Sequence, residues 1–265
     1  MNKYLYRIVY NKARGMLMVA ADIAKSGRAN SGRSSGTGHT LTKRFCTLTA
    51  LQFSLWLALG AIIPAQAAIV ADGRAPGYQQ PTIISSANGT PQVNIQTPSA
   101  GGVSRNLYSQ FSVDNKGVIL NNSHASIQTK LGGMITANPW MARGEARVIL
   151  NEVNSRDPSR FNGFIEVAGR KAQVIIASPS GITCDGCGFI NASRATMTTG
   201  NVLLKNDTIA GYDVERGEIV IQGRGMDASL ADHTDLIARS VSLNAGIWAG
   251  ELSITTGANR IDATH

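Results

Sequence analysis

Two cysteines spaced three residues apart are the first side chains whose types and spacing could do chemistry. Cys184 and Cys187 stand in ITCDGCGF, and the one other cysteine is Cys46. A redox-active pair usually opens a helix after a strand, but Asp185-Gly186 favours a turn. A zinc site needs a second pair of ligands, which the sequence does not offer nearby. The spacing therefore favours a disulfide that closes a tight turn, with free thiols and a metal or redox pair as the alternatives.

The segment Asp232-His233-Thr234-Asp235 is the one local cluster of carboxylates with an imidazole. Enzymes that cleave polysaccharides need carboxylates gathered on one face, and the other acids of this chain are scattered along it. No serine elbow, P-loop or zinc-binding helix accompanies the cluster. We therefore interpret it as a solvated loop, and we predict no catalytic site, no metal site and no cofactor.

Short aliphatic runs, each ended by Asn, Gly, Ser or Pro, are the elements that must position these side chains. They are Val118-Ile119-Leu120, Val148-Ile149-Leu150, Val174-Ile175-Ile176, Val202-Leu203-Leu204 and Ile219-Val220-Ile221, with VSLNAG at 241 and LSITTG at 252. Three aliphatics followed by Asn or a small polar residue, at roughly coil spacing, favour an all-β solenoid with stacked corners. Coils of about 20–25 residues would number about eight after residue 67. A β-sandwich is the alternative.

The net charge of +8 belongs to the beginning of the chain. Residues 1–50 hold nine basic residues and one acid, whereas the remainder holds sixteen of each. A nucleic-acid partner is therefore not predicted, because the basic residues form a leader rather than a patch on the folded domain. The apolar stretch 48–63 follows Lys43-Arg44 and ends at Pro64, as in a Sec signal peptide.

Small residues after Pro64 predict where this signal is removed. Ala65 and Ala67 form the small-x-small pattern that a signal peptidase reads, so Ala68 would become the first residue of a 198-residue mature chain. An uncleaved N-terminal anchor is the alternative.

Several long stretches resemble the haemagglutination-activity, or TPS, domain of two-partner secretion exoproteins, which include filamentous haemagglutinins and contact-dependent inhibition proteins. They are FSVDNKGVILNNS (111–123), QTKLGGMITANPW (128–140), ARVILNEVNSRDPSRFNGFIEVAG (146–169), AQVIIASPSGITCDGCGFINASRATMTTG (172–200) and LIARSVSLNAGIWAGELSITTGANRI (236–261). Residues 1–25 resemble the extended signal peptide region of very large secreted Gram-negative proteins, which leaves 26–67 as spacer and Sec signal peptide.

The resemblance implies a right-handed parallel β-helix over 68–265, with an N-terminal cap over 68–117 and small extra-helical strands. It also implies a secretion signal that the POTRA domains of a partner outer-membrane barrel recognise in the periplasm. Export of an adhesin, a haemagglutinin-like protein or a contact-dependent inhibition protein to the cell surface or medium would follow. A host cell or a neighbouring bacterium would be the surface it meets.

Two motifs of that family have counterparts here. The family's NPNL corresponds to Asn138-Pro139-Trp140-Met141, and its NPNGI corresponds to Ser178-Pro179-Ser180-Gly181-Ile182, in which serine replaces both asparagines. Serine keeps a short acceptor for a turn but tolerates positive φ less well than asparagine. The turn is expected to persist. A complete short adhesin or a truncated remnant is the alternative function, followed by a polysaccharide-active enzyme.

Overall fold

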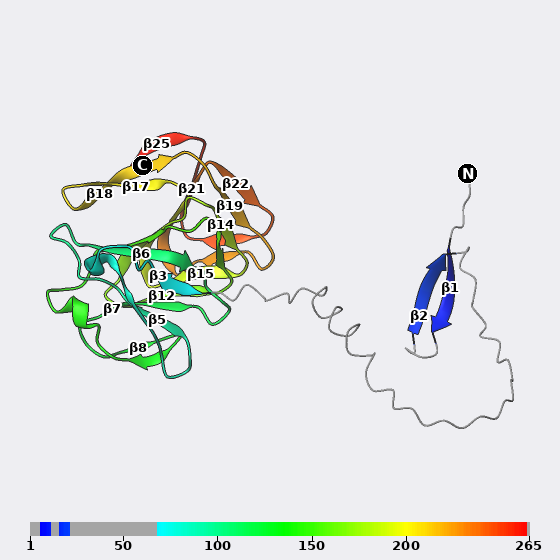
Figure 1. Cartoon of the computed structure of the whole chain (residues 1–265), viewed down its shortest axis with the longest axis horizontal. Coiled ribbons are helices and arrows are strands. Elements are labelled where there is room, and N and C mark those ends of the chain that lie inside the picture. The colour runs from blue at the N-terminus through cyan, green and yellow to red at the C-terminus, as the bar shows by residue number, and fades with distance from the viewer. Residues whose placement is uncertain (1–5, 12–15, 22–67, 264–265) are drawn as a thin grey trace, which may run out of the picture. The chain divides into compact units, whose positions relative to one another are not determined.

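The computed structural model describes residues 6–11, 16–21 and 68–263. It forms two separate units, of which the first contains the antiparallel pair β1 (Tyr6–Asn11) and β2 (Met16–Ala21). The second unit holds all the other described strands (Figure 1). None of its helices is long or apolar enough to cross a membrane, since the described helical elements are two three-residue 3₁₀ turns.

The second unit is a parallel β-helix whose coils visit three sheets in the order I, II, III. Sheet I contains the parallel strands β6 (Val103–Phe111), β10 (Val148–Val153), β13 (Ala172–Ala177), β16 (Ala192–Thr198), β21 (Ala231–Ala238) and β24 (Leu252–Thr256). Sheet II contains β11 (Ser159–Phe161), β14 (Ile182–Cys184), β19 (Glu218–Ile221) and β22 (Ser240–Leu243). Sheet III contains β5 (Pro91–Asn94), β7 (Val118–Asn122), β12 (Phe164–Gly169), β15 (Cys187–Ile190), β20 (Met226–Ala228) and β23 (Ile247–Ala249).

The number of coils is smaller than the sequence predicted. Sheets I and III each contain six parallel strands, whereas about eight coils were expected. Uninterrupted coils are as short as predicted: Val148 pairs with Gln173, and Val174 pairs with Ala195. Two coils are longer because each carries an inserted hairpin. The insertions use chain length without adding height to the stack.

These two insertions are the extra-helical strands. β8 (Ile127–Thr129) and β9 (Gly133–Ile135) form a hairpin that packs on the outer face of sheet III. β17 (Asn201–Lys205), β18 (Thr208–Val214) and β25 (Asn259–Asp262) form a second small sheet, which packs on the outer face of sheet I (Figure 1). The run at 202–204 is therefore outside the coils.

The extra-helical strands cover the outer faces of sheets I and III. This explains why three aliphatic residues follow one another in these strands instead of alternating with polar residues. On β10, Ile149 faces the central core, whereas Leu150 faces outward against the covering sheet. On β7, Ile119 likewise faces outward beneath the β8–β9 hairpin. Both faces of these strands are buried, and a strand buried on both sides reads as a continuous apolar run.

The two ends of the stack differ. At the start, β3 (Ile69–Ala71) pairs antiparallel with β6, and β4 (Thr82–Ser85) pairs antiparallel with β5. Only β3 and β4 therefore cover the first coil with antiparallel strands. The strands β5 and β6 belong to that coil, because they pair in parallel with β7 and β10 of the next one.

At the other end, the last coil contains β22, β23 and β24, each at the edge of its sheet. Leu243, Leu252 and Ile254 stack on inward-facing positions of the coil below and are exposed. The final layer of the core therefore faces solvent among the described residues.

Candidate functional site

The Ser178–Ile182 motif forms the corner between β13 and β14, where the chain passes from sheet I to sheet II. The Ser178 side chain is buried and its hydroxyl donates to the Gly181 carbonyl at 3.0 Å. The Ser159 hydroxyl of the preceding coil donates to Ser178 Oγ at 3.1 Å. The Gly181 N–H donates to the Ser178 carbonyl at 2.9 Å, which closes the turn. The corner is therefore bonded internally and to the coil below it.

The serines cost this turn no backbone strain. Neither Ser178 nor Ser180 has a positive φ, and Gly181 takes the one such conformation in the motif at 111°. Ser180 instead donates its hydroxyl to the Ser155 carbonyl at 2.6 Å. The turn persists, as expected, because the residue that needs φ above zero is a glycine in either version of the motif.

Asn138 holds the second motif in place from a buried position. Its Nδ2 donates to the carbonyls of Ile95 at 2.9 Å and Asn121 at 2.8 Å, so one amide ties together the ends of β5 and β7. Its Oδ1 accepts from the Trp140 N–H at 3.0 Å, which caps the 3₁₀ turn η2 (Pro139–Met141). A single side chain thus fixes both the coil corner and the turn that follows it.

The remaining residues of this motif divide between core and surface. Met141 is buried in the central core, whereas Pro139 and Trp140 are exposed, with Trp140 at 43%. The Thr97 hydroxyl donates to the Trp140 carbonyl at 2.9 Å. No hydrogen bond joins this motif to the Ser178–Ile182 turn within the part of the chain that the structure describes.

Cys184 and Cys187 form a disulfide at the corner between β14 and β15, with Cα atoms 5.4 Å apart. Asp185, inside this corner, accepts from the backbone N–H of Arg224 at 3.0 Å and from its Nε at 3.3 Å. Arg224 Nη2 also donates to the carbonyls of Asp185 and Asn162. The backbone hydrogen bond from Arg224, and next the side-chain bond, hold the pKa of Asp185 below its usual value. Arg224 thus joins the same corner of three successive coils.

Replacing both cysteines with serine is expected to lower the free energy of unfolding by roughly 2 kcal/mol, because the loop that the bond closes is very short. Urea unfolding of the oxidised parent and of the variant measures this difference. The parent under a thiol reductant serves as the control and should unfold at the same urea concentration as the variant. Equal stability of variant and oxidised parent would show that the bond contributes nothing.

The cluster at 232–235 lies within strand β21 rather than in the solvated loop that the sequence suggested. Asp235 has no exposed surface, and it accepts from Arg194 Nε at 2.5 Å, Arg194 Nη2 at 2.9 Å and Thr196 Oγ1 at 2.8 Å. His233 lies between two carboxylates, with Nε2 2.8 Å from Asp235 and Nδ1 3.1 Å from Glu251. This is a structural ion network that joins β16, β21 and the end of the stack.

Opposing effects act on the titration of Asp235. Burial raises its pKa, but the hydrogen bonds from Arg194 and Thr196 lower it by more, so the net shift is downward. Tyr212 on β18 packs beside the network, and burial raises its pKa to about 12. Asp232, by contrast, is exposed and pairs with Lys171 at the surface. Among the described residues, no group of three His, Cys, Asp or Glu side chains is placed to hold a metal ion.

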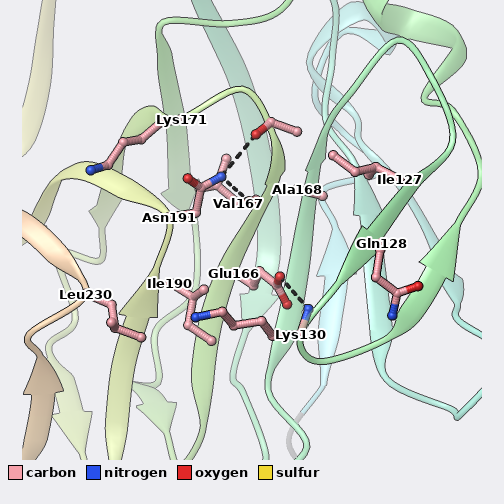
Figure 2. A pocket seen from close by; sticks show the side chains of 11 residues that line it. Ile127, Gln128, Lys130, Glu166, Val167, Ala168, Lys171, Ile190, Asn191 and Leu230 are labelled. Atoms are coloured by element: carbon pink, nitrogen blue, oxygen red, sulfur yellow. Dashed lines mark hydrogen bonds between the residues drawn. The ribbon is translucent and has the colours of Figure 1, made fainter.

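A groove of about 350 Å³ lies between the β8–β9 hairpin and sheet III (Figure 2). Glu166 is buried beside it, and its carboxylate accepts from the backbone N–H groups of Lys130 at 2.7 Å and Leu131 at 2.8 Å. Figure 2 shows the Lys130 side chain reaching toward Ile190. Asn191 donates to the carbonyls of Val167 and Gly169. Both Glu166 and Asn191 hold neighbouring backbone, so they fasten the hairpin and the corner.

Comparison with known proteins identifies the class. The chain belongs to the two-partner secretion family: a family model described as the TPS secretion domain matches residues 67–265. A second model, the Extended Signal Peptide of Type V secretion system, matches residues 1–51. The chain therefore carries the secretion domain of an exoprotein that is exported through the periplasm to the cell surface or the medium.

Particular relatives narrow this class. The chain is 71% identical over its whole length to Toxin CdiA of Yersinia pestis, and 40% identical over 99% of its length to tRNA nuclease CdiA-2 of Burkholderia pseudomallei. It spans 8% of the length of each of these relatives. The crystal structure of a filamentous hemagglutinin secretion domain matches with a TM-score of 0.68 and 35% identity, over 74% of this chain and 65% of that one. The predicted β-helix and secretion-domain assignment are confirmed.

Proposed function

We propose that the POTRA domains of a partner outer-membrane barrel recognise residues 68–265 through the exposed part of the Asn138–Met141 motif. The observation that supports this proposal is that two residues of the motif are buried and two are exposed. Asn138 and Met141 are buried and fix the turn, whereas Pro139 and Trp140 are presented to solvent on it. An exposed tryptophan on a rigid turn is the kind of side chain that anchors a protein interface.

Replacing Trp140 with alanine is expected to reduce secretion at least tenfold and to leave the folded domain intact, since the side chain contributes little to the core. Immunoblotting of culture medium and periplasm measures export, and pull-down with the purified POTRA domains measures binding. Met134→Ala, which removes another exposed apolar side chain, is the control and should be exported normally. Normal export and POTRA binding of Trp140→Ala would assign recognition to another surface.

The Ser178–Ile182 turn supports recognition less directly in this proposal. Ser178 and Ile182 are buried, and Ser180 is partly buried and bonded to Ser155. The turn thus sets the geometry of the corner between sheets I and II, and Pro179 and Ser180 supply its accessible atoms. Restoring asparagine at 178 and 180 should then change POTRA affinity less than Trp140→Ala does.

Removal of the leader after Ala67 is part of the same proposal. Ala65 and Ala67 lie outside the described residues, whereas the Ala68 carbonyl accepts from the Ser112 N–H at 2.9 Å and β3 begins one residue later. Cleavage there would release the domain at the edge of its folded part. N-terminal sequencing of the exported protein tests this, with Ala68 expected as the first residue.

The domain itself acts in export rather than in catalysis, under this proposal. Among the described residues, the buried carboxylates Asp72, Glu166 and Asp235 each accept hydrogen bonds from neighbouring groups of the protein. The names of the relatives favour a toxin-delivery exoprotein as the exported protein, which would meet the surface of another cell. A second candidate, a short secreted adhesin, would itself bind the target surface.

A further inference from the structure

The disulfide between Cys184 and Cys187 is buried inside the β-helix. Cys184 has no exposed surface, Cys187 is 2% exposed, and both side chains belong to the central core. Cys184 lies on β14 between Phe161 of the preceding coil and Ile221 of the next one. Both sulfur atoms are therefore out of reach of any macromolecule that approaches the folded domain.

The following coil closes the corner over this bond. β19 covers β14, and β20 covers β15, the strand on which Cys187 lies. The Gly186 N–H donates to the Gly225 carbonyl at 2.8 Å, and Arg224 donates to both the carboxylate and the carbonyl of Asp185. The corner opens only if these strands and hydrogen bonds separate first. Access to the sulfur atoms therefore ends when β19 and β20 join the stack.

In the unfolded chain, by contrast, the two thiols meet easily. Only Asp185 and Gly186 separate them, and glycine adopts the positive φ of this turn, 80°, at no steric cost. Cys46, the one other cysteine, lies far away in the leader. The closed ring also leaves the chain narrow, because its Cα atoms are 5.4 Å apart, against about 10 Å for the same residues fully extended.

We infer that a thiol–disulfide exchange protein of the periplasm, acting as an oxidase, forms the Cys184–Cys187 bond on the unfolded chain, before export and before the coils stack. Export of this class of chain leads through the periplasm, which enzymes of this kind keep oxidising. The pair of cysteines is thus a substrate site that disappears on folding. The inference does not rest on recognition of Trp140 by the partner barrel.

The reaction passes through one mixed disulfide between the chain and the oxidase. The thiolate of one cysteine attacks the disulfide of the oxidase, bonds to one of its sulfur atoms and releases the other as a thiolate. The thiolate of the second cysteine then attacks the chain's own sulfur atom in that mixed disulfide. The ring closes, and two electrons and two protons have passed from the chain to the oxidase, which leaves as a dithiol.

Thiol trapping in cells tests when the bond forms. Cells that produce the full chain are quenched with acid, and free thiols are alkylated in denaturant with a maleimide–polyethylene glycol, which adds mass for each thiol. In cells without the partner barrel, the chain retained in the periplasm is expected to be oxidised. In cells without the oxidase, the reduced fraction of the periplasmic and exported chains should rise about tenfold or more. The double serine variant marks the position of a chain without these thiols.

The reverse reaction tests whether folding closes access to the sulfur atoms. Reduced thioredoxin is expected to open the bond of the folded, exported chain at least about a hundredfold more slowly than that of the chain unfolded in urea, because the folded corner must first open locally. The matched control places cysteines at Lys205 and Thr208 in the double serine background. These positions have the same separation but lie in an exposed hairpin turn, so thioredoxin should open that bond at similar rates in both conditions.

Two free thiols in the periplasmic chain together with a disulfide in the exported chain would overturn the inference. So would an unchanged redox state of both forms in cells that lack the oxidase. Equal rates of reduction for the folded and unfolded chain, with the control pair behaving as expected, would show that the sulfur atoms stay accessible and that the bond has no need to precede folding.

Discussion

Replacing Asp235 with alanine is expected to lower the free energy of unfolding by about 3 kcal/mol, because a buried charge network loses its central acceptor. The change removes two hydrogen bonds from Arg194 and one from Thr196, and it leaves the guanidinium in a largely buried position without its carboxylate. Equilibrium unfolding in urea measures the effect.

Asp232→Ala is the matched control, since it removes a carboxylate three residues away on the same strand. Its ion pair with Lys171 is exposed, so the expected loss is at most about 1 kcal/mol. Similar losses from both substitutions would contradict the assignment of the network as the stabilising feature. So would a negligible loss from Asp235→Ala.

The pH dependence of stability should report the same carboxylate. Folding lowers the pKa of Asp235 below its ordinary value of 3.8, so the ionised group stabilises the folded state at neutral pH. That contribution is fully present above the unfolded pKa and is lost as the pH falls through the lower folded value. The stability difference between the parent and Asp235→Asn is therefore expected to shrink below about pH 4.

Replacing Asn138 with alanine is the second change with a large expected effect, at about 2–4 kcal/mol. The substitution leaves the carbonyls of Ile95 and Asn121 without this donor and removes the cap of the η2 turn. Export should also fall, because Trp140 would no longer be held on a fixed turn. Thermal unfolding and the secretion assay measure the two consequences separately.

The control for this change is Asn244→Ala, an exposed asparagine whose side chain makes no hydrogen bond among the described residues. It should alter stability by less than about 0.5 kcal/mol. Comparing Asn138→Ala with Trp140→Ala is equally informative. Reduced export with normal stability in the tryptophan variant, and reduced stability in the asparagine variant, would separate recognition from folding. Unchanged stability of Asn138→Ala would show that the motif is not structural.

The solenoid was predictable from the sequence because every coil requires the same kinds of residue at its stacked positions. Aliphatic runs followed by asparagine mark positions where side chains stack, and the structure pairs Asn94 with Asn121 and Asn106 with Asn151 in adjacent coils. The coil number was not predictable. An aliphatic run such as 202–204 reads alike whether it forms a coil or an extra-helical hairpin that covers one.

Sites whose residues come from several coils could not be predicted from the sequence. Asp235 and Arg194 are 41 residues apart in the chain, and only the register between β16 and β21 brings them together. The corner motifs, by contrast, are local turns, so the residues that form them are neighbours in the chain. Register is set by the accumulated length of preceding corners and insertions, which no short motif encodes.

The last described coil resembles the growing end of a polymer after nucleation. The first coils must bring together strands that are distant in the chain, whereas a strand arriving at β22, β23 or β24 meets a finished template. It gains backbone hydrogen bonds and covers Leu243, Leu252 and Ile254 in the same step. Elongation from this end is therefore favourable one coil at a time, with little further loop-closure cost.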